Sequence, residues 1–234
     1  MCKIDKRKRY IVVVDTETCP LDKDFQGVNP YNMFTYDIGW AVVDKKGNVY
    51  ETKSYIVKDI FEGEKDLMKS AYYANKIPNY LEDLKNGKRT LATWYAIMVD
   101  LKETMARYNT NIVACHNARF DDGATKNTQR WLTKSKYRYF FPYGTIVWDT
   151  MKMALDVIAT MPTYIRFCKE NGYMTKHKTP RPQVKAEVIY KFLTNDNDFV
   201  ESHTGLEDVL IEKEILAYCF SKHQKMRKEL YTRG

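Results

Sequence analysis

An apolar run at residues 10–14, Tyr-Ile-Val-Val-Val, continues directly into the acidic residues Asp15 and Glu17. A short run rich in β-branched residues is typical of a strand that is buried on both faces of a sheet. Because side chains two apart in a strand point to the same side, we expect both carboxylates to project together. Two such carboxylates repel each other and lose hydration, which raises a pKa unless a cation compensates. The pattern therefore indicates a strand buried in a sheet, and hard oxygen ligands of this kind suit Mg²⁺ or Mn²⁺.

A third acid, Asp121, follows a second predicted strand. Taken alone, Asp15 and Glu17 also fit the ordinary interpretation of solvated turn or cap residues at a strand end. Residues 111–115, however, have the pattern of another short buried strand, and residues 116–121, His-Asn-Ala-Arg-Phe-Asp, lead into an amphipathic stretch at 124–132. Asp121 is therefore expected at a strand-to-helix junction, where open α/β sheets tend to place their sites.

The last part of the chain has helical spacing. Apolar side chains recur three and four residues apart between residues 206 and 220, which predicts a helix over 204–228 with one buried stripe. Asp208 lies in its first two turns, and His203 lies at or just before its start. In isolation, such an acid complements the helix dipole and such a histidine caps or packs. With the two earlier segments, they complete a set of four carboxylates and one histidine.

This set resembles the DEDDh family of 3′-to-5′ exonucleases, whose members include the proofreading epsilon subunit of bacterial DNA polymerase III, oligoribonucleases and the three-prime repair exonucleases. Asp15 and Glu17 match the Asp-x-Glu of the first motif, Asp121 the Asp that follows an aromatic residue in the second, and Asp208 the Asp of the third. His203 precedes Asp208 by five positions, which is the spacing of the histidine subclass. The tyrosine subclass has Tyr four positions before this Asp, where the present chain has Thr204.

The alternation of strand-like and helix-like segments indicates an α/β fold with a mixed sheet. The resemblance narrows this to a ribonuclease H-like fold, with a central mixed five-stranded sheet flanked by helices. We expect one exonuclease domain over residues 1–234, because no stretch resembles a Pro-, Ser- or Gly-rich linker. Residues 36–44 and 49–57 predict a hairpin, and Asp149 is predicted to cap a helix over 151–158.

The resemblance implies a two-metal mechanism with two divalent cations, Mg²⁺ or Mn²⁺. The metal ligands would be the four carboxylates, those of Asp15, Glu17, Asp121 and Asp208. His203 would take the proton from the attacking water, a role suited to a side chain that titrates near neutral pH. The product implied by the family is a nucleoside 5′-monophosphate.

The resemblance also indicates where the 3′ end of a substrate would bind. The backbone at Thr16 and the region around Thr18 would meet the terminal 3′-hydroxyl. Asn117 and Phe120 would border the last nucleotide.

The chain departs from the family pattern at three places. Gly205 stands where the usual residue is Ala, and residues 58–89 and 171–202 match the compact members poorly. None of these differences changes the five catalytic positions. They leave the substrate preference open.

The charge of the chain indicates a polyanionic partner. Lys and Arg number 38 against 30 Asp and Glu, so the net charge is +8 although the proposed site is acidic. The candidate basic patches are residues 3–9, 85–89, 130–138 and 176–181; each could bind phosphates or be an ordinary solvated face. An aromatic and basic cluster at 136–143 is either a packing unit or a nucleic-acid contact.

The five cysteines are odd in number, widely spaced and without a Cys-x-x-Cys pair, which argues against a disulfide framework or a zinc site. We expect reduced thiols in a cytoplasmic protein. The basic N-terminal segment lacks a long apolar stretch, so we expect neither a signal peptide nor a membrane span.

Three functions follow from these observations. The leading hypothesis is a metal-dependent 3′-to-5′ exonuclease acting on single-stranded DNA or frayed 3′ ends, with a polymerase or replication protein as a possible partner. The second is an RNA-trimming or oligoribonuclease-like enzyme with the same chemistry. The third is a catalytically silent nucleic-acid-binding scaffold, against which the intact set of five residues argues.

Overall fold

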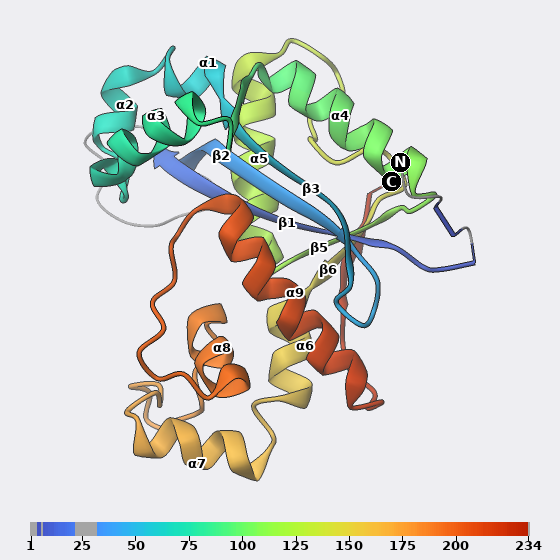
Figure 1. The fold of residues 1–234 in the computed structure, drawn as a ribbon, viewed down its shortest axis with the longest axis vertical. Helices are drawn as coiled ribbons and strands as arrows, with labels where there is room; N and C mark the ends of the chain where they lie inside the picture. The colour runs from blue at the N-terminus through green and yellow to red at the C-terminus, as the bar shows by residue number, and fades with distance from the viewer. Residues whose placement is uncertain (1–3, 6, 22–31, 234) are drawn as a thin grey trace.

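The computed structural model of the protein describes residues 4–5, 7–21 and 32–233 (Figure 1). The strands are β1 (Ile11–Pro20), β2 (Met33–Val43), β3 (Val49–Val57), β4 (Thr90–Ala92), β5 (Ile112–Cys115), β6 (Ile146–Asp149) and β7 (Glu229–Thr232). The helices are α1 (Lys58–Phe61), α2 (Lys65–Lys69), the 3₁₀ turn η2 (Ala74–Lys76), α3 (Ile77–Lys85), α4 (Trp94–Arg107), α5 (Ala118–Leu132), α6 (Thr150–Val157), α7 (Pro162–Glu170), α8 (Ala186–Thr194) and α9 (Gly205–Ser221).

The strands within the described ranges form one mixed sheet in the order β4-β3-β2-β1-β5-β6-β7. β1 pairs antiparallel with β2 and parallel with β5. The predicted α/β fold with a mixed sheet is confirmed, but the predicted count of five strands is wrong, because the sheet has seven. The extra strands β4 and β7 lie at the two edges and are three and four residues long. Both are short and partly exposed, so they lack the continuous apolar run that marks the buried strand β5 in the sequence.

Helices cover both faces of the sheet, and the alternation of β1 decides which residues face which layer. Val12 and Val14 belong to the core beneath α4 and α5, whereas Ile11 and Val13 belong to the core beneath α6, α8 and α9. Figure 1 shows α9 crossing one face of the sheet and α5 lying behind it. Since side chains alternate along a strand, Asp15 continues the row of Ile11 and Val13 and faces the α9 side.

Three predicted boundaries differ from the structure. β1 runs on to Pro20, so Asp15 and Glu17 lie inside the strand and not beyond its end. α5 already begins at Ala118, which places Asp121 in its first turn. α9 ends at Ser221 instead of reaching residue 228, and His223 just beyond it has a φ of 52°. A left-handed residue after a helix terminates it, and the chain then extends into β7.

Two local predictions are confirmed. β2 and β3 form the expected hairpin, with Gly47 at a φ of 80° and the Asp44 carboxylate accepting from the Lys46 N–H at 2.8 Å. Asp149 caps α6 by accepting from the Met151 N–H at 3.0 Å. The Asp149 carboxylate also accepts from the Asn117 N–H at 3.2 Å. This second bond ties the end of β6 to the start of α5.

The aromatic cluster at 136–143 divides into packing and exposed parts. Phe140 and Phe141 are buried, and the Phe140 ring lies 4.5 Å from that of Trp94. Tyr143 is exposed. The packing interpretation therefore holds for the two phenylalanines.

Four cysteines, Cys19, Cys115, Cys168 and Cys219, are buried free thiols. Cys2 lies outside the described residues, as do Lys3 and Lys6 of the basic patch at 3–9. Within the part of the chain that the structure describes, no helix combines the length and apolarity that crossing a membrane requires.

Candidate active site

The residues predicted for the site line one hollow of about 830 Å³. They are Asp15, Thr16, Glu17, Thr18, Asn117, Phe120, Asp121, His203 and Asp208. β1, the start of α5 and the start of α9 supply them. The fold therefore brings together three segments that lie far apart in the sequence.

The tightest group in the hollow consists of Glu17, His203 and Asp208. Their ligand atoms all lie within 4.8 Å of one another, close enough to hold a metal ion. Glu17 comes from β1 and Asp208 from the first turn of α9, which packs on the face that the odd residues of β1 present. This arrangement follows from the strand alternation described above.

Asp121 approaches the same hollow from the other face of β1. Its Oδ1 accepts a hydrogen bond from the Thr16 hydroxyl at 2.8 Å. Thr16 points toward α5 because it alternates with Asp15 and Glu17. The Thr16 side chain thus fixes Asp121, which leaves only the backbone of Thr16 for the substrate contact predicted from the sequence.

The carboxylates that line the hollow are largely buried, so their charged forms are poorly hydrated. Burial raises the pKa of Asp121 to about 7 and the pKa of Asp208 to about 8. The pKa values of Asp15 and Glu17 also lie well above the ordinary range, first because of burial and then because of neighbouring carboxylates. Divalent cations would relieve this repulsion, and carboxylate oxygens are the ligands that Mg²⁺ and Mn²⁺ prefer.

Two further acids line the hollow that the sequence analysis missed. Glu212 is buried, and its Oε2 accepts from the His116 N–H at 3.2 Å. It lies four residues after Asp208, so the helical period could have placed both acids on one face of α9. Glu201 has its Oε2 3.6 Å from the His203 Nδ1, and burial raises its pKa to about 7.

Tyr72 and Tyr73 also line the hollow. They come from residues 58–89, a stretch that matches the compact members of the family poorly. The Tyr73 ring stacks on the His203 imidazole, so this stretch contributes a contact to a predicted site residue. No local motif marks these tyrosines, because their role depends on a contact with a segment far along the chain.

A buried ionic network anchors the start of α9. The Asp37 carboxylate of β2 accepts from the Gly205 N–H at 3.0 Å, from the Tyr80 hydroxyl at 2.9 Å and from the Arg89 guanidinium at 3.2 Å. Arg89 also bonds Glu207 at 2.7 Å. Only 2% of the Arg89 side chain is exposed, so the prediction of a surface patch at 85–89 is wrong for this residue. Its buried charge is paired, as such a charge must be.

Gly205, at the position where the resemblance led us to expect Ala, lies where no Cβ fits. A Cβ at Gly205 would lie 2.8 Å from the Gly39 nitrogen, and one at Gly39 would lie 2.3 Å from the Leu206 nitrogen. Two glycines thus let α9 approach β2 closely enough for Asp208 to reach the carboxylates of β1.

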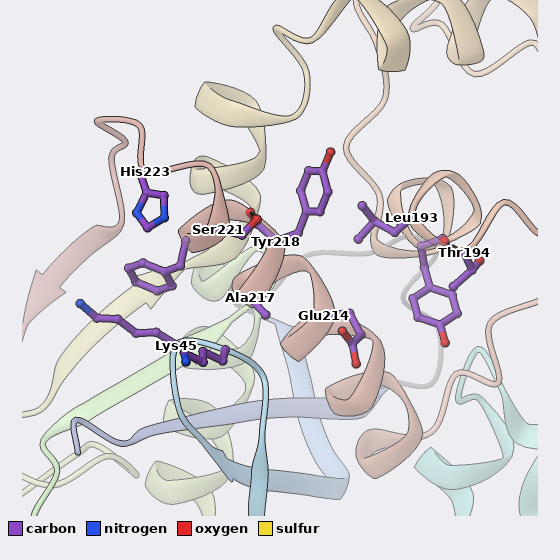
Figure 2. Close-up of a pocket in the computed structure, with 11 residues that line it drawn as sticks. Lys45, Leu193, Thr194, Glu214, Ala217, Tyr218, Ser221 and His223 are labelled. Atoms are coloured by element: carbon purple, nitrogen blue, oxygen red, sulfur yellow. Dashed lines mark hydrogen bonds between the residues drawn. The ribbon is translucent and has the colours of Figure 1, made fainter. Parts of the chain in front are cut away.

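A second hollow, of about 850 Å³, lies beside the turn between β2 and β3 and the last turns of α9 (Figure 2). Its lining includes Lys45, Lys46, Tyr218 and His223 and, among the described residues, a single carboxylate, that of Glu214. It therefore lacks the acidic donor set that a divalent cation requires. The acidic hollow is therefore the candidate site for a metal ion.

The fold and the acidic hollow define an α/β protein with a mixed sheet and a candidate metal site on it. No protein-family model matches the sequence, and no curated protein matches it. Solved structures of Exonuclease I do match. The zinc-ion-bound form of an Escherichia coli ExoI–ssDNA complex is 15% identical, with a TM-score of 0.55 over 92% of this chain and 41% of that chain.

Two further Exonuclease I structures agree. The moderately thermophilic Exonuclease I of Methylocaldum szegediense is 18% identical, with a TM-score of 0.56 over 92% of this chain and 41% of that chain. An ExoI/SSB-Ct complex is 16% identical, with a TM-score of 0.54 over 93% of this chain and 42% of that chain. The present chain thus spans less than half the length of these chains. At such identities the likeness shows a shared fold, the ribonuclease H-like fold expected from the sequence.

Proposed function

We propose that the protein is a metal-dependent 3′-to-5′ exonuclease that hydrolyses phosphodiester bonds at the 3′ ends of single-stranded or frayed DNA and releases nucleoside 5′-monophosphates. The observation that carries this proposal is the convergence of Glu17, His203 and Asp208 within 4.8 Å inside the acidic hollow. The fold shared with the Exonuclease I structures supports it.

The donor set fits two divalent cations, Mg²⁺ or Mn²⁺. Asp15, Glu17, Asp121 and Asp208 would hold them, because these buried carboxylates have raised pKa values and need positive charge nearby. When bound, the cations would activate a water molecule and neutralise charge that develops on the phosphate.

His203 would accept the proton of the attacking water. Burial and the nearby Lys76 lower its pKa, so the imidazole is neutral near pH 7 and able to act as a base. The Glu201 carboxylate, 3.6 Å from the His203 Nδ1, would stabilise the imidazolium that results. The position of His203 beside Glu17 and Asp208 and its contact with Glu201 support this role.

The rim of the hollow suits an unpaired strand. Tyr72 is 77% exposed there, and Phe120, Lys176 and Lys185 also line it. Aromatic rings stack on unpaired bases, and lysines attract phosphates. We therefore propose that Phe120, Asn117 and the region of Thr18 border the terminal nucleotide. A polymerase or replication partner and a cytoplasmic location stay predictions from the sequence.

Labelled oligonucleotides test the proposal. The full chain is incubated with 3′- or 5′-labelled single-stranded DNA, duplex DNA and RNA, in Mg²⁺, Mn²⁺ or chelator. We expect metal-dependent loss of nucleotides from the 3′ end of single-stranded DNA. Asp208→Asn should abolish this activity, and His203→Ala should lower the rate by roughly 10²–10⁴-fold.

Other outcomes would point elsewhere. Trimming of RNA alone would favour the RNA-trimming alternative. Binding without hydrolysis under all metal conditions would favour the silent scaffold. Full activity of Asp208→Asn would remove the proposed site.

A further inference from the structure

We propose that Tyr73 is a positioning residue for His203: its ring, held by the 3₁₀ turn η2, fixes the imidazole beside the metal-ligand carboxylates. This inference rests on the proposed role of His203 as the proton acceptor.

His203 needs support from outside its own segment. It lies two residues before α9 begins, and its φ of 50° is in the left-handed region, which is uncommon for a residue other than glycine. One third of its side chain is exposed. A side chain at this place would sample several rotamers unless a neighbour restricted it.

Tyr73 supplies a flat surface for the imidazole. The two ring centroids are 4.5 Å apart and the ring planes differ by 15°, so the rings are stacked. A stack of this kind limits rotation of the imidazole to its own plane and keeps its nitrogens near Glu17 and Asp208, with which His203 forms the 4.8 Å group.

Lys76 fixes the backbone of the same residue. Its ammonium donates to the carbonyl oxygen of Ser202 and, at 3.4 Å, to that of His203. The same ammonium lies 4.2 Å from the centroid of the Tyr73 ring. One short segment, residues 73–76, therefore holds both the side chain and the main chain of His203.

This segment is itself anchored. The Lys76 N–H donates to the Tyr73 carbonyl at 2.9 Å, and Ala71 just before the segment is buried. The following helix α3 carries Tyr80, whose hydroxyl bonds the Asp37 carboxylate that also holds Gly205. Residues 71–80 thus connect the turn beneath His203 to the start of α9, and the stack sits on a fixed support.

The physical consequence concerns the chemical step and not substrate binding. A general base acts only within hydrogen-bond reach of the proton it removes, and misplacement by about 1 Å can cost about 10²-fold in rate. Tyr73→Leu removes the ring plane. We expect it to lower kcat by about 10- to 100-fold with a much smaller change in KM.

The ring, and not the hydroxyl, carries this role. Burial and the nearby Glu17 raise the pKa of the Tyr73 hydroxyl, so it does not form a phenolate that could itself accept the proton. Tyr73→Phe keeps the stack and removes the hydroxyl, and we expect it to retain nearly the full kcat. A loss in Tyr73→Phe equal to that in Tyr73→Leu would overturn the proposal in favour of a role for the hydroxyl.

A double-mutant cycle with His203→Ala separates positioning from general destabilisation. kcat and KM are measured on labelled single-stranded DNA for both single variants and the double variant, after circular dichroism confirms folding. In the His203→Ala background, Tyr73→Leu should cause no further loss of kcat. Tyr95→Leu, at an exposed tyrosine on α4 outside the hollow, is the matched control and should leave both constants unchanged.

The possible failures are distinguishable. A full kcat for Tyr73→Leu beside a strong loss for His203→Ala overturns the inference and leaves the proposed function intact. Equal losses from Tyr73→Leu in both backgrounds overturn it as well. A full rate for His203→Ala contradicts the proposed base, and the inference falls with it. Should Tyr73→Leu not fold, Tyr73→Met, which keeps apolar contact but no ring plane, carries the same expectation.

Discussion

Asp121 and Asp208 are carboxylates that the fold removes from water, and their pKa values of about 7 and about 8 reflect the loss of hydration. The ordinary value for both is 3.8. Hydrogen bonds, such as that from Thr16 to Asp121, offset only part of the cost. Keeping such groups charged near neutral pH destabilises the folded state, and perturbed pKa values of this kind are typical of functional clusters.

These raised pKa values make the stability of the folded state depend on pH, and the direction of that dependence can be measured in the presence of a chelator. The folded-state pKa of both groups exceeds the unfolded value, so between pH 3.8 and about 8 the folded protein binds more protons than the unfolded one. Stability must then fall as pH rises through this window. We expect Asp121→Asn and Asp208→Asn to flatten the decline of the thermal midpoint between pH 4 and pH 8, in runs read by circular dichroism.

Asp156 offers a control for that experiment. Hydrogen bonds from Arg227 lower the pKa of the Asp156 carboxyl. Its contribution to the stability of the folded state is therefore present above the unfolded-state pKa and is lost as the pH falls through the folded-state pKa. Asp156→Asn should leave the slope between pH 4 and pH 8 unchanged. A decline in both site variants that is as steep as in the parent protein would contradict the assigned burial of charge.

At the scale of secondary-structure elements, the start of α9 determines the geometry of the site. The helix carries Asp208 and Glu212, and the chain enters it through His203. Its first residue, Gly205, approaches the backbone of β2 at Gly39, and Asp37 accepts its N–H. The close approach and the buried Arg89 network together fix the distance between α9 and β1.

Gly205→Ala tests whether close approach or helix propensity decides at this position. Propensity alone predicts stabilisation by about 0.5–1 kcal/mol. The added Cβ would instead lie 2.8 Å from the Gly39 nitrogen, so we expect a loss of about 1–3 kcal/mol in the free energy of unfolding, together with a loss of activity. Chemical denaturation and the nuclease assay measure the two.

Gly87→Ala is the control that separates the effect of a steric clash on stability from the effect of backbone strain. Gly87 has a φ of 68°, and a Cβ added there would meet no atom within 4 Å, so its substitution costs only backbone strain of about 1–2 kcal/mol. The activity of this variant should therefore be kept. If Gly205→Ala proves more stable than the parent protein, the close approach does not limit this helix.

At the scale of the whole molecule, charge is divided between an acidic hollow and a basic remainder. The net charge is +8, yet the hollow gathers the carboxylates. Lys176 and Lys185 stand on its lining, and the exposed Arg181 lies in the same predicted basic patch as Lys176. Such a division would guide a polyanion to the rim while the cations neutralise the centre.

Salt dependence tests this division. Binding of labelled single-stranded DNA is measured by fluorescence anisotropy over a range of salt, in the Asp208→Asn protein with chelator so that hydrolysis does not occur. We expect the pair Lys176→Gln and Arg181→Gln to weaken binding and to make the salt slope shallower, by about 0.7 for each phosphate that the protein no longer neutralises. Lys45→Gln with Lys46→Gln, at the hollow of Figure 2, is the matched control. Equal weakening by both pairs would contradict a strand path along residues 176–181.

Local patterns allowed a good part of the fold to be predicted. The strand at residues 10–14, the hairpin around Gly47 and the cap at Asp149 depend on neighbours within a few residues, and all three are present. The edge strands β4 and β7 were missed because they are short and partly exposed, so no continuous apolar run marks them as it marks β5. The predicted helix extended past the observed end of α9 at Ser221, because apolar spacing does not reveal a left-handed residue at position 223.

The sequence by itself determined the donor groups of the candidate site, because an acid pair on one side of a buried strand and a histidine five residues before an acid are local features. Only the tertiary structure decided which other groups reach the hollow. Tyr73 and Arg89 act through contacts with residues more than one hundred positions away, His203 and Glu207. Packing brings such partners together, and no spacing along the chain encodes that contact.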